Sequence, residues 1–383
     1  SDPAVQELLD RFHVRENELP VVVCRGEHVF RRPRNRDIVD CLGMNPQIDL
    51  ARVRDLIVVG AGPAGLSAAV YAASEGLDVL VLEVMAPGGQ AGSSSKIENY
   101  LGFPTGISGQ ALAGRALVQS QKFGANVAIG WRAQRLLCDR GPYGVELEDG
   151  RVVTARSIII ATGAQYRSLP LDNLQRFVGL GVYYAATHLE AKLCKGEEII
   201  IVGGGNSAGQ AAVFMANSCG HVHIVIRGKS LEASMSRYLI RRIEEHRHIT
   251  LHTQTELTAL DGVDRLERVS WRCRENDGEV TEDISHLFLM TGAVPNTQWL
   301  EGCLQLDEKG FVRTGADLGR EELQSCRWPL QRSPFLSETS LPGIFAVGDV
   351  RSGSVKRVAS SVGEGSICIQ FVHRALPELA AQV

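Results

Sequence analysis

The chain contains 383 residues, of which 44% are hydrophobic and 22% are charged, and both values are ordinary for globular proteins. The formal net charge of −4 argues against a nucleic-acid-binding protein, and no apolar run approaches the roughly 18–20 residues of a membrane span. The length predicts two or three domains. We therefore expect no nucleic-acid partner and no membrane partner.

Nine cysteines are scattered along the chain, and no two of them lie closer than 17 positions apart. This spacing is unlike that of a disulfide scaffold or a zinc site. We therefore expect unpaired thiols and a cytoplasmic protein.

Residues 1–51 form a small N-terminal segment with its own pattern. The sequence predicts a helix over residues 5–12, strands over 19–24 and 28–31, and a helix over 35–41 that Asn35 caps. This order resembles the second half of a thioredoxin fold, and the resemblance implies a cis Leu19–Pro20 bond. A simple arm that packs on the main body is the alternative.

From Asp55 onward, short apolar strands alternate with helices. A strand over 56–59, a helix over 64–74 and a strand over 78–83 form one βαβ unit, and a second unit spans residues 198–226. The pattern predicts an α/β fold with two doubly wound dinucleotide-binding domains, whose parallel sheets carry helices on both faces. Residues 314–340 are polar and irregular, which favours a surface insertion.

The first βαβ unit carries a glycine motif between its strand and its helix: Gly60-Ala61-Gly62-Pro63-Ala64-Gly65. In such a motif the first glycine permits the tight turn, the second lets a pyrophosphate approach, and the third lets the helix pack on the strand. Glu83 follows Gly60 by 23 residues, where a carboxylate can bind ribose hydroxyls. This combination predicts an FAD site.

The second unit carries a similar motif, Gly203-Gly204-Gly205-Asn206-Ser207-Ala208. Here the position 23 residues after the first glycine is Ile226, which Arg227 and Lys229 follow. A missing acid beside cations suits a 2′-phosphate, so the sequence predicts an NADPH site. Two such sites in one chain indicate hydride transfer from a visiting nicotinamide to a resident flavin.

Later motifs occur in an order that resembles the thioredoxin reductase family. They are Gly88-Gly89-Gln90, Ile97-Glu98-Asn99-Tyr100, Ala161-Thr162-Gly163, Met290-Thr291-Gly292, Gly343-Ile344-Phe345-Ala346-Val347-Gly348-Asp349 and Arg357-Val358-Ala359. The resemblance implies further FAD-binding residues: Gly89, Gln90, Asn99, Thr162, Gly163, Asp349, Arg357, Val358 and Ala359. It also implies that Gly292 contributes to the NADPH site and that the protein is a homodimer whose domains rotate.

One departure from that family concerns chemistry. The family carries a Cys-x-x-Cys pair before its NADPH motif, whereas residues 181–190 of this chain contain no cysteine. Alignment from the left places His188 at the second cysteine, and alignment from the right places Leu189 there. His188 and Glu190 are candidate proton donors, and a polar turn that has lost its cysteines is the alternative. We interpret His246, His248 and His252 as surface residues.

These observations predict an FAD-binding domain over residues 52–167 and 294–383, with an NADPH-binding domain over 168–293 between them. We expect an NADPH-dependent flavoprotein reductase without an internal redox disulfide. Its electron acceptor would be external: a protein disulfide, a ferredoxin-like carrier, a quinone or oxygen. The alternative is a flavin-based redox sensor or regulatory binding protein with little turnover.

Overall fold

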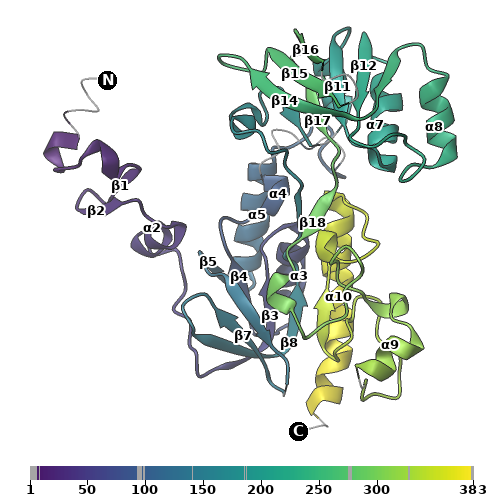
Figure 1. Ribbon diagram of the computed structural model, residues 1–383. Helices are drawn as coiled ribbons and strands as arrows, with labels where there is room; N and C mark the ends of the chain where they lie inside the picture. Colours follow the sequence, from purple (N-terminus) through teal and green to yellow (C-terminus); the bar gives the residue numbers. More distant parts are fainter. Residues whose placement is uncertain are drawn as a thin grey trace. The chain divides into compact units, whose positions relative to one another are not determined.

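The chain divides into two compact units (Figure 1). A computed structural model describes residues 7, 9–92, 97, 100–139, 141–184, 186, 188–274, 278–326 and 328–380. Unit 1 comprises residues 1–164 and 295–383, and unit 2 comprises residues 165–294. No helix in these described ranges is both long and apolar enough to cross a membrane.

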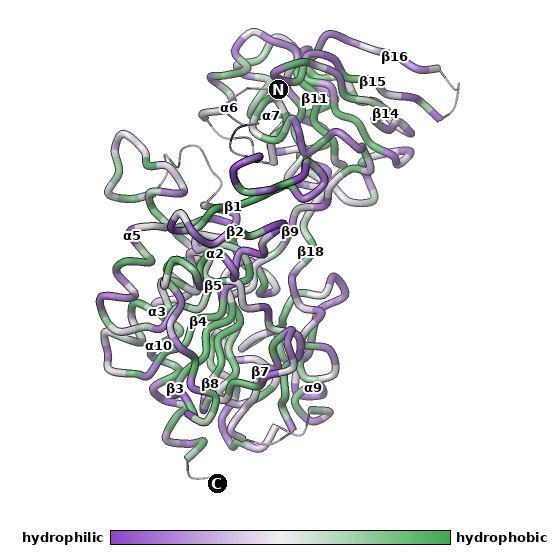
Figure 2. The backbone as a smooth tube through the Cα atoms, turned by 90° about the vertical axis from the view of Figure 1, so that its left-hand side faces the viewer, coloured by the Kyte–Doolittle hydropathy of each residue, from purple (hydrophilic) through white to green (hydrophobic). Residues whose placement is uncertain are grey.

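Unit 1 is built on a mixed sheet in the order β5-β4-β3-β8-β7-β6, with β19 paired to β8. Strands β5, β4, β3, β8 and β19 run parallel, whereas β7 is antiparallel to both β8 and β6. The strands are β3 (Val53–Val59), β4 (Val79–Glu83), β5 (Asn126–Ile129), β6 (Ala133–Leu137), β7 (Tyr143–Leu147), β8 (Val152–Ile160) and β19 (Ile344–Ala346). The tube of β3, β4 and β8 is predominantly green in Figure 2, as expected for buried parallel strands.

Helices cover one face of this sheet. They are α3 (Pro63–Ser74), α5 (Gly109–Lys122) and α10 (Val358–Ala380), and α10 lies beside α3 (Figure 1). The opposite face packs against side chains of the β6–β7 hairpin and of the segment around Trp299 and Val312. The parallel sheet is confirmed, but the expectation of helices on both faces is wrong here, because an antiparallel hairpin connects β5 to β8.

The N-terminal segment contains β1 (Val21–Cys24) and β2 (His28–Arg31), which form an antiparallel hairpin, and α2 (Asn35–Cys41). A short 3₁₀ turn, η1, covers Glu16–Glu18. The Leu19–Pro20 bond is cis, as expected. Asn35 is the first residue of α2 rather than its cap: Arg34 occupies the cap position, and its backbone N–H donates to Asp37. Of the helix expected over residues 5–12, residues 7 and 9–11 are helical, and residues 5, 6 and 8 lie outside the described residues.

Unit 2 has a parallel sheet in the order β10-β17-β11-β12-β13 and a separate antiparallel sheet, β14-β15-β16. The parallel strands are β10 (Val182–Tyr183), β11 (Glu198–Val202), β12 (His221–Val225), β13 (Ile249–His252) and β17 (Leu287–Leu289). The antiparallel strands are β14 (Thr255–Asp261), β15 (Arg268–Cys273) and β16 (Glu279–Glu282). Two crossover strands, β9 (Ala164–Tyr166) and β18 (Ala293–Pro295), pair with each other.

The faces of the parallel sheet in unit 2 also differ from expectation. Helices α7 (Asn206–Met215) and α8 (Arg237–Glu244) cover one face, and a further helix, α6 (His188–Leu193), contributes Ala191 to the same cluster. The other face packs against Leu260, Val269 and Trp271 of the antiparallel sheet. The connection from β13 to β17 is therefore a three-stranded meander where a doubly wound domain would place a helix.

Residues 314–340 are not simply a surface insertion, and that expectation is corrected. The segment contains η4 (Gly315–Asp317), which is flanked by the buried Thr314 and Leu318, and the helix α9 (Arg320–Ser325), and residues 337–340 are also buried. Glu338 accepts hydrogen bonds from Arg332 at 2.6 Å and from the Gly343 backbone at 2.9 Å. This internal ion pair allows a polar sequence to enter the core of unit 1.

Candidate functional site

The first glycine turn lies between β3 and α3. Gly60 has φ +103°, and a Cβ there would lie 2.4 Å from the carbonyl oxygen of Ala161 at the end of β8. A Cβ at Gly65 would lie 1.9 Å from the carbonyl oxygen of Gly60. Both positions require glycine because backbone meets backbone, which confirms the packing roles expected of the first and third glycines.

Gly62 is different, because nothing in the protein crowds it. An added Cβ would meet a single neighbour within 4 Å, the Cα of Gly89 at 3.9 Å. Gly62 is the N-cap of α3 and Pro63 is the first helical residue, so the free amides of the helix start lie beside this open position. The turn therefore fits a phosphate group that approaches the backbone at the helix N-terminus.

Glu83 ends β4 and is 9% exposed. Its carboxylate accepts hydrogen bonds from the backbone N–H of Ala61 at 2.7 Å and of Met85 at 2.8 Å. Glu83 thus holds the glycine turn to the end of β4. Each carboxylate oxygen has a second acceptor site, so the predicted bonds from ribose hydroxyls remain available.

Two further sequence motifs meet near this turn in unit 1. Gly89 and Gln90 open the short helix α4 (Gly89–Gly92), and the Gln90 side chain donates to the Ala164 carbonyl. Thr162 donates to the Asn296 carbonyl, and Asn296 donates to the Thr162 carbonyl, each at 2.8 Å. Asn99 lies outside the described residues. These two hydrogen bonds join the residues that follow β8 to the residues that follow β18.

Asp349 follows β19 within the turn η5 (Gly348–Val350). Burial raises the pKa of its carboxyl group, and the Lys356 ammonium group donates to its backbone carbonyl at 3.2 Å. Arg357, Val358 and Ala359 lie at the N-terminal end of α10. With Gly163 (φ +66°) after β8, all described FAD candidates gather where β3, β4, β8 and β19 end, which is where open α/β sheets bind ligands.

Sequence reasoning missed the glycine that brings α10 onto α3. A Cβ at Gly365 would lie 2.2 Å from the carbonyl oxygen of Ala64. Ser67 on α3 also donates to the Val362 carbonyl of α10 at 2.8 Å. The small residues that begin α10, among them Ser361 and Gly363, were the available signal for this close approach.

The second glycine turn, in unit 2, repeats the backbone device of the first. Gly203 has φ +148°, and a Cβ there would lie 2.4 Å from the carbonyl oxygen of Met290. Gly205 caps α7, and Asn206 and Ser207 are exposed in its first turn. Ala208 at the third position is fully buried. The side chain of Asn206 accepts a hydrogen bond from the Ser236 backbone at 2.8 Å.

The end of β12 carries the predicted phosphate-binding cations. Ile226 is buried, whereas Arg227 and Lys229 are exposed. Arg274 forms an ion pair with Glu256, and its hydrogen bond lowers the pKa of that carboxyl group. The positive charge of Arg227 lowers the same pKa further. Gly292 has φ +85° and accepts a hydrogen bond from the Arg167 backbone at 2.9 Å.

Of residues 181–190, which contain no cysteine, the last three begin α6. Its side chains at His188 and Leu189 lie outside what the structure describes, so neither alignment is favoured, and Glu190 lies on the first turn. Burial raises the pKa of Cys194 to about 12 and that of Cys219 to about 11. Both thiols are therefore poor nucleophiles at neutral pH.

The histidines of unit 2 are less exposed than expected. His252 pairs with His223 at 3.0 Å in a partly buried contact, and His223 also contacts Glu198 at 3.1 Å. His246, His248 and His252 are each partly exposed, so His252 lies at the surface within a histidine pair rather than free in solvent. Within the described ranges, no three His, Cys, Asp or Glu side chains form a group that could hold a metal ion.

Four of the nine cysteines form two disulfides, which corrects the expectation of unpaired thiols. Cys24 at the end of β1 bonds Cys41 at the end of α2, and Cys138 after β6 bonds Cys303. Cys138 and Cys303 lie 165 residues apart, so no local sequence pattern could predict that they pair. Free cysteines in the structure are Cys194, Cys219, Cys273, Cys326 and Cys368.

The Cys138–Cys303 disulfide lies away from the carboxyl ends of the parallel strands of unit 1, where the FAD candidates gather. Leu137, the residue before Cys138, pairs with Gly144, which in turn pairs with Thr154 near the start of β8. Six residues separate Thr154 from Ile160 at the carboxyl end, which corresponds to about 20 Å of strand. This disulfide therefore lies about 20 Å of strand away from the sheet edge at which the FAD candidates gather.

Comparisons with known proteins agree on one family. The model of the family described as "Pyridine nucleotide-disulphide oxidoreductase" matches residues 54–365. The thioredoxin reductase of Escherichia coli O157:H7 is 30% identical over 331 residues, covering 85% of this chain and 97% of that protein. NADPH-dependent thioredoxin reductase 3 of Arabidopsis thaliana is 32% identical, but the chain spans only 58% of its length. Thioredoxin reductase from Streptococcus pyogenes MGAS5005 has 28% identity and a TM-score of 0.72, with 85% of this chain and 99% of that chain covered.

Proposed function

Because the chain belongs to the pyridine nucleotide-disulphide oxidoreductase family and is a thioredoxin reductase-like flavin oxidoreductase, we propose that it uses NADPH to reduce a bound FAD. The observation that carries the proposal is the contrast between the two glycine turns. The first ends beside a buried carboxylate, Glu83, and the second beside exposed cations, Arg227 and Lys229. A buried acid suits a resident ribose, and exposed cations suit an exchanging phosphate.

Bound FAD would accept a hydride from NADPH and pass the electrons onward. The chain's own residues hold and orient the two nucleotides. Glu83 and the open position at Gly62 support the adenosine and pyrophosphate of FAD, while the Asp349 region and the start of α10 support its flavin half. Arg227 and Lys229 select the 2′-phosphate of NADPH.

The electron acceptor in this proposal is external. Residues 181–190 contain no cysteine, and the Cys138–Cys303 disulfide lies at the amino end of the sheet. A protein disulfide, a ferredoxin-like carrier, a quinone or oxygen would then meet the flavin directly. The cytoplasmic setting and the homodimer stay predictions, and the two disulfides weigh against a strongly reducing compartment.

An anaerobic NADPH titration tests the proposal. We expect about two electrons per FAD, no thiolate-to-flavin charge-transfer band, and the same thiol count by alkylation before and after reduction. A demand for four electrons with new thiols would contradict an external acceptor. A colourless protein after incubation with excess FAD would contradict the flavin assignment itself.

Gly62→Ala tests whether the FAD pyrophosphate occupies the open position beside this glycine. An added Cβ meets no crowded atom in the protein, so we expect the melting temperature of the apoprotein to stay unchanged. FAD affinity should fall by about 100-fold, or about 3 kcal/mol, because the methyl group occupies the space of the pyrophosphate. Equal FAD affinity in the variant and the wild type would contradict this placement.

A redox sensor remains the second candidate, and the docked N-terminal segment favours it, because that segment adds a structural element beside Glu83. Sustained NADPH consumption with any of the four acceptor classes would support the reductase. Flavin reduction without turnover would support the sensor.

A further inference from the structure

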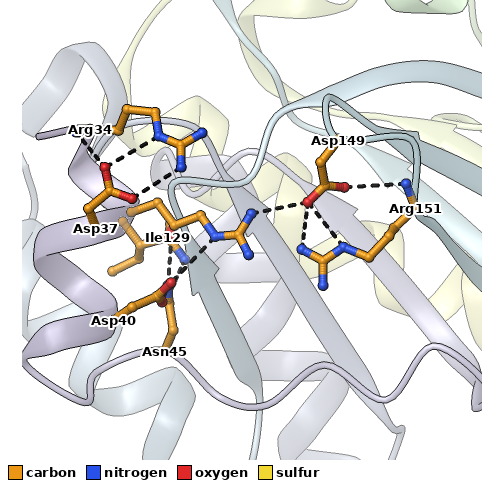
Figure 3. A network of polar contacts seen from close by, with 8 residues as sticks. Arg34, Asp37, Asp40, Asn45, Ile129, Asp149 and Arg151 are labelled. Carbon is orange, nitrogen blue, oxygen red and sulfur yellow. Dashed lines mark hydrogen bonds and ion pairs between the residues drawn. The ribbon is translucent and has the colours of Figure 1, made fainter.

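The N-terminal segment contacts the rest of unit 1 at Ile129, the last residue of β5, and at Asp149 (Figure 3). Ile129 in turn pairs with Glu83 of β4. Three contacts carry this docking, and they come from Asn35, Arg36 and Asn45. They lie before residue 54, where the match to the family model begins. The docking is therefore a property of this chain that the family resemblance does not supply.

Asn45 holds the end of β5. Its side-chain amide donates to the Ile129 carbonyl at 2.9 Å, and its side-chain oxygen accepts from the Ile129 N–H at 2.8 Å. Ile129 is the residue that pairs with Glu83 across β4 and β5. The same Asn45 amide donates to Asp40 of α2 at 2.6 Å, so the helix and the strand end share one anchor.

Arg36 holds the residue that follows this strand end. Its guanidinium lies 3.7 Å from the centre of the Trp131 ring, and Arg151 lies near the same ring at 4.3 Å. Arg36 also donates to Asp149 at 3.1 Å, and Arg151 lowers the pKa of that carboxyl group through hydrogen bonds. Trp131 is 6% exposed, and its backbone N–H donates to the Glu83 carbonyl at 2.9 Å.

Asn35 reaches the other side of Glu83. Its side chain donates to the Met85 carbonyl at 3.4 Å, and the Met85 N–H donates to the Glu83 carboxylate at 2.8 Å. The fit between α2 and the strand end is close, since a Cβ at Gly130 would lie 2.6 Å from the Cβ of Arg36. Residues on both sides of Glu83 are thus held by one appended helix and the loop that follows it.

We propose that Asn35, Arg36 and Asn45 form an adenosine-side clamp, which positions Glu83 for the ribose of bound FAD. The inference rests on the proposed FAD site. The clamp lies near β4 and β5, whereas the flavin-half candidates follow β8 and β19 on the other side of β3. The three are positioning residues: they act through Met85, Ile129 and Trp131, and they retain FAD without contacting its reacting ring.

The position of the clamp predicts which ligands it affects. ADP shares the adenosine half of FAD, and FMN lacks that half. Loss of the clamp should therefore weaken FAD and ADP alike and leave FMN unchanged. A general loosening of unit 1 would weaken all three.

The experiment measures FAD release from the full-length holoprotein as FAD that passes an ultrafiltration membrane and is separated from FMN by chromatography, with ADP or FMN as displacing ligand. Arg36→Ala and Asn45→Ala should each release FAD about tenfold faster, as expected for loss of a cation–π contact with a buried tryptophan or of a paired amide. The FMN concentration for half-displacement should fall about tenfold, and the ADP concentration should stay the same. Arg34→Ala is the matched control, because Arg34 is exposed and pairs with Asp37 in its own helix. It should behave as wild type.

Unchanged FAD release in Arg36→Ala and Asn45→Ala would overturn the clamp and leave the proposed function standing. An unchanged FMN half-displacement with faster FAD release would also overturn it, because the effect would then be general. Absence of FAD from the wild-type protein would instead refute the proposed function.

Discussion

The two glycine turns share one backbone device and differ in what surrounds it. In each turn the first glycine has a positive φ. A Cβ at Gly60 would lie 2.4 Å from the carbonyl oxygen of Ala161, and a Cβ at Gly203 would lie 2.4 Å from that of Met290. In each, the middle glycine is uncrowded: a Cβ at Gly62 or at Gly205 would have its nearest neighbour at 3.9 Å.

The difference begins at the third position. Gly65 is required because a Cβ would strike the Gly60 carbonyl at 1.9 Å, whereas Ala208 carries a Cβ at the equivalent place and is fully buried. It continues at the strand end, where Glu83 is buried and Ile226 is followed by exposed cations. The comparison separates two reasons for a glycine: packing explains the first and third, whereas the middle one, which no protein atom crowds, leaves room for the proposed nucleotide.

Exchanging glycine and alanine at the third motif position, Gly65 in unit 1 and Ala208 in unit 2, should give the largest change in the free energy of unfolding. Gly65→Ala should destabilise unit 1 by about 3 kcal/mol, at the upper end of overpacking costs, and release FAD, because the contact is with backbone that cannot move aside. The reverse change in unit 2, Ala208→Gly, should cost about 1 kcal/mol, the usual value for glycine inside a helix. Chemical denaturation with flavin-to-protein ratios would measure both. Equal costs would show that the two turns do not differ as described.

The cations after β12 should give the next effect. Arg227→Ala should lower the preference for NADPH over NADH by about 10- to 100-fold in kcat/KM, which corresponds to one charge-assisted hydrogen bond of about 1.5–3 kcal/mol. The loss should appear with NADPH and not with NADH. Lys229→Ala serves as the neighbouring comparison on the same exposed loop. Equal kcat/KM for the two nucleotides in the wild type would refute the phosphate assignment.

A smaller effect should appear in the pH dependence of stability, which should differ between the two units. Burial and the neighbouring His223 lower the pKa of His252 and of His221 below the ordinary histidine value of about 6.5. The unfolded chain therefore binds these protons more tightly, so stability is complete above pH 6.5 and falls as the pH drops below it. The slope is at most about 1.4 kcal/mol per pH unit for each proton.

Hydrogen exchange at pH 5.5 and 7.5, corrected for intrinsic rates, would detect this loss in β12 and β13. His252→Gln should reduce the dependence, and the amides of β3 and β4 in unit 1 are the internal comparison. Equal pH dependence in both pairs of strands would contradict the assignment to the histidine cluster.

The amino-acid sequence by itself determined the βαβ units, the glycine turns and the acid-to-cation change at the strand ends. These features are local, because strand periodicity, a positive φ and the spacing from glycine to strand end all act within about 25 residues. The sequence did not reveal the antiparallel strands β6–β7 and β14–β16, because these strands are short. A buried sheet face also has the same hydrophobic pattern whether a helix or a hairpin covers it.

Only the tertiary structure decided the disulfide pairs, the approach of Gly365 to Ala64, and the docking of α2 beside Glu83. Cys138 and Cys303 lie 165 residues apart, and Asn45 and Ile129 lie 84 residues apart. Such contacts have no sequence period, because they depend on which strand ends and helix faces the whole chain brings together. The candidate nucleotide-binding residues of the two glycine turns are thus local in origin, whereas the residues proposed to position them come from distant parts of the chain.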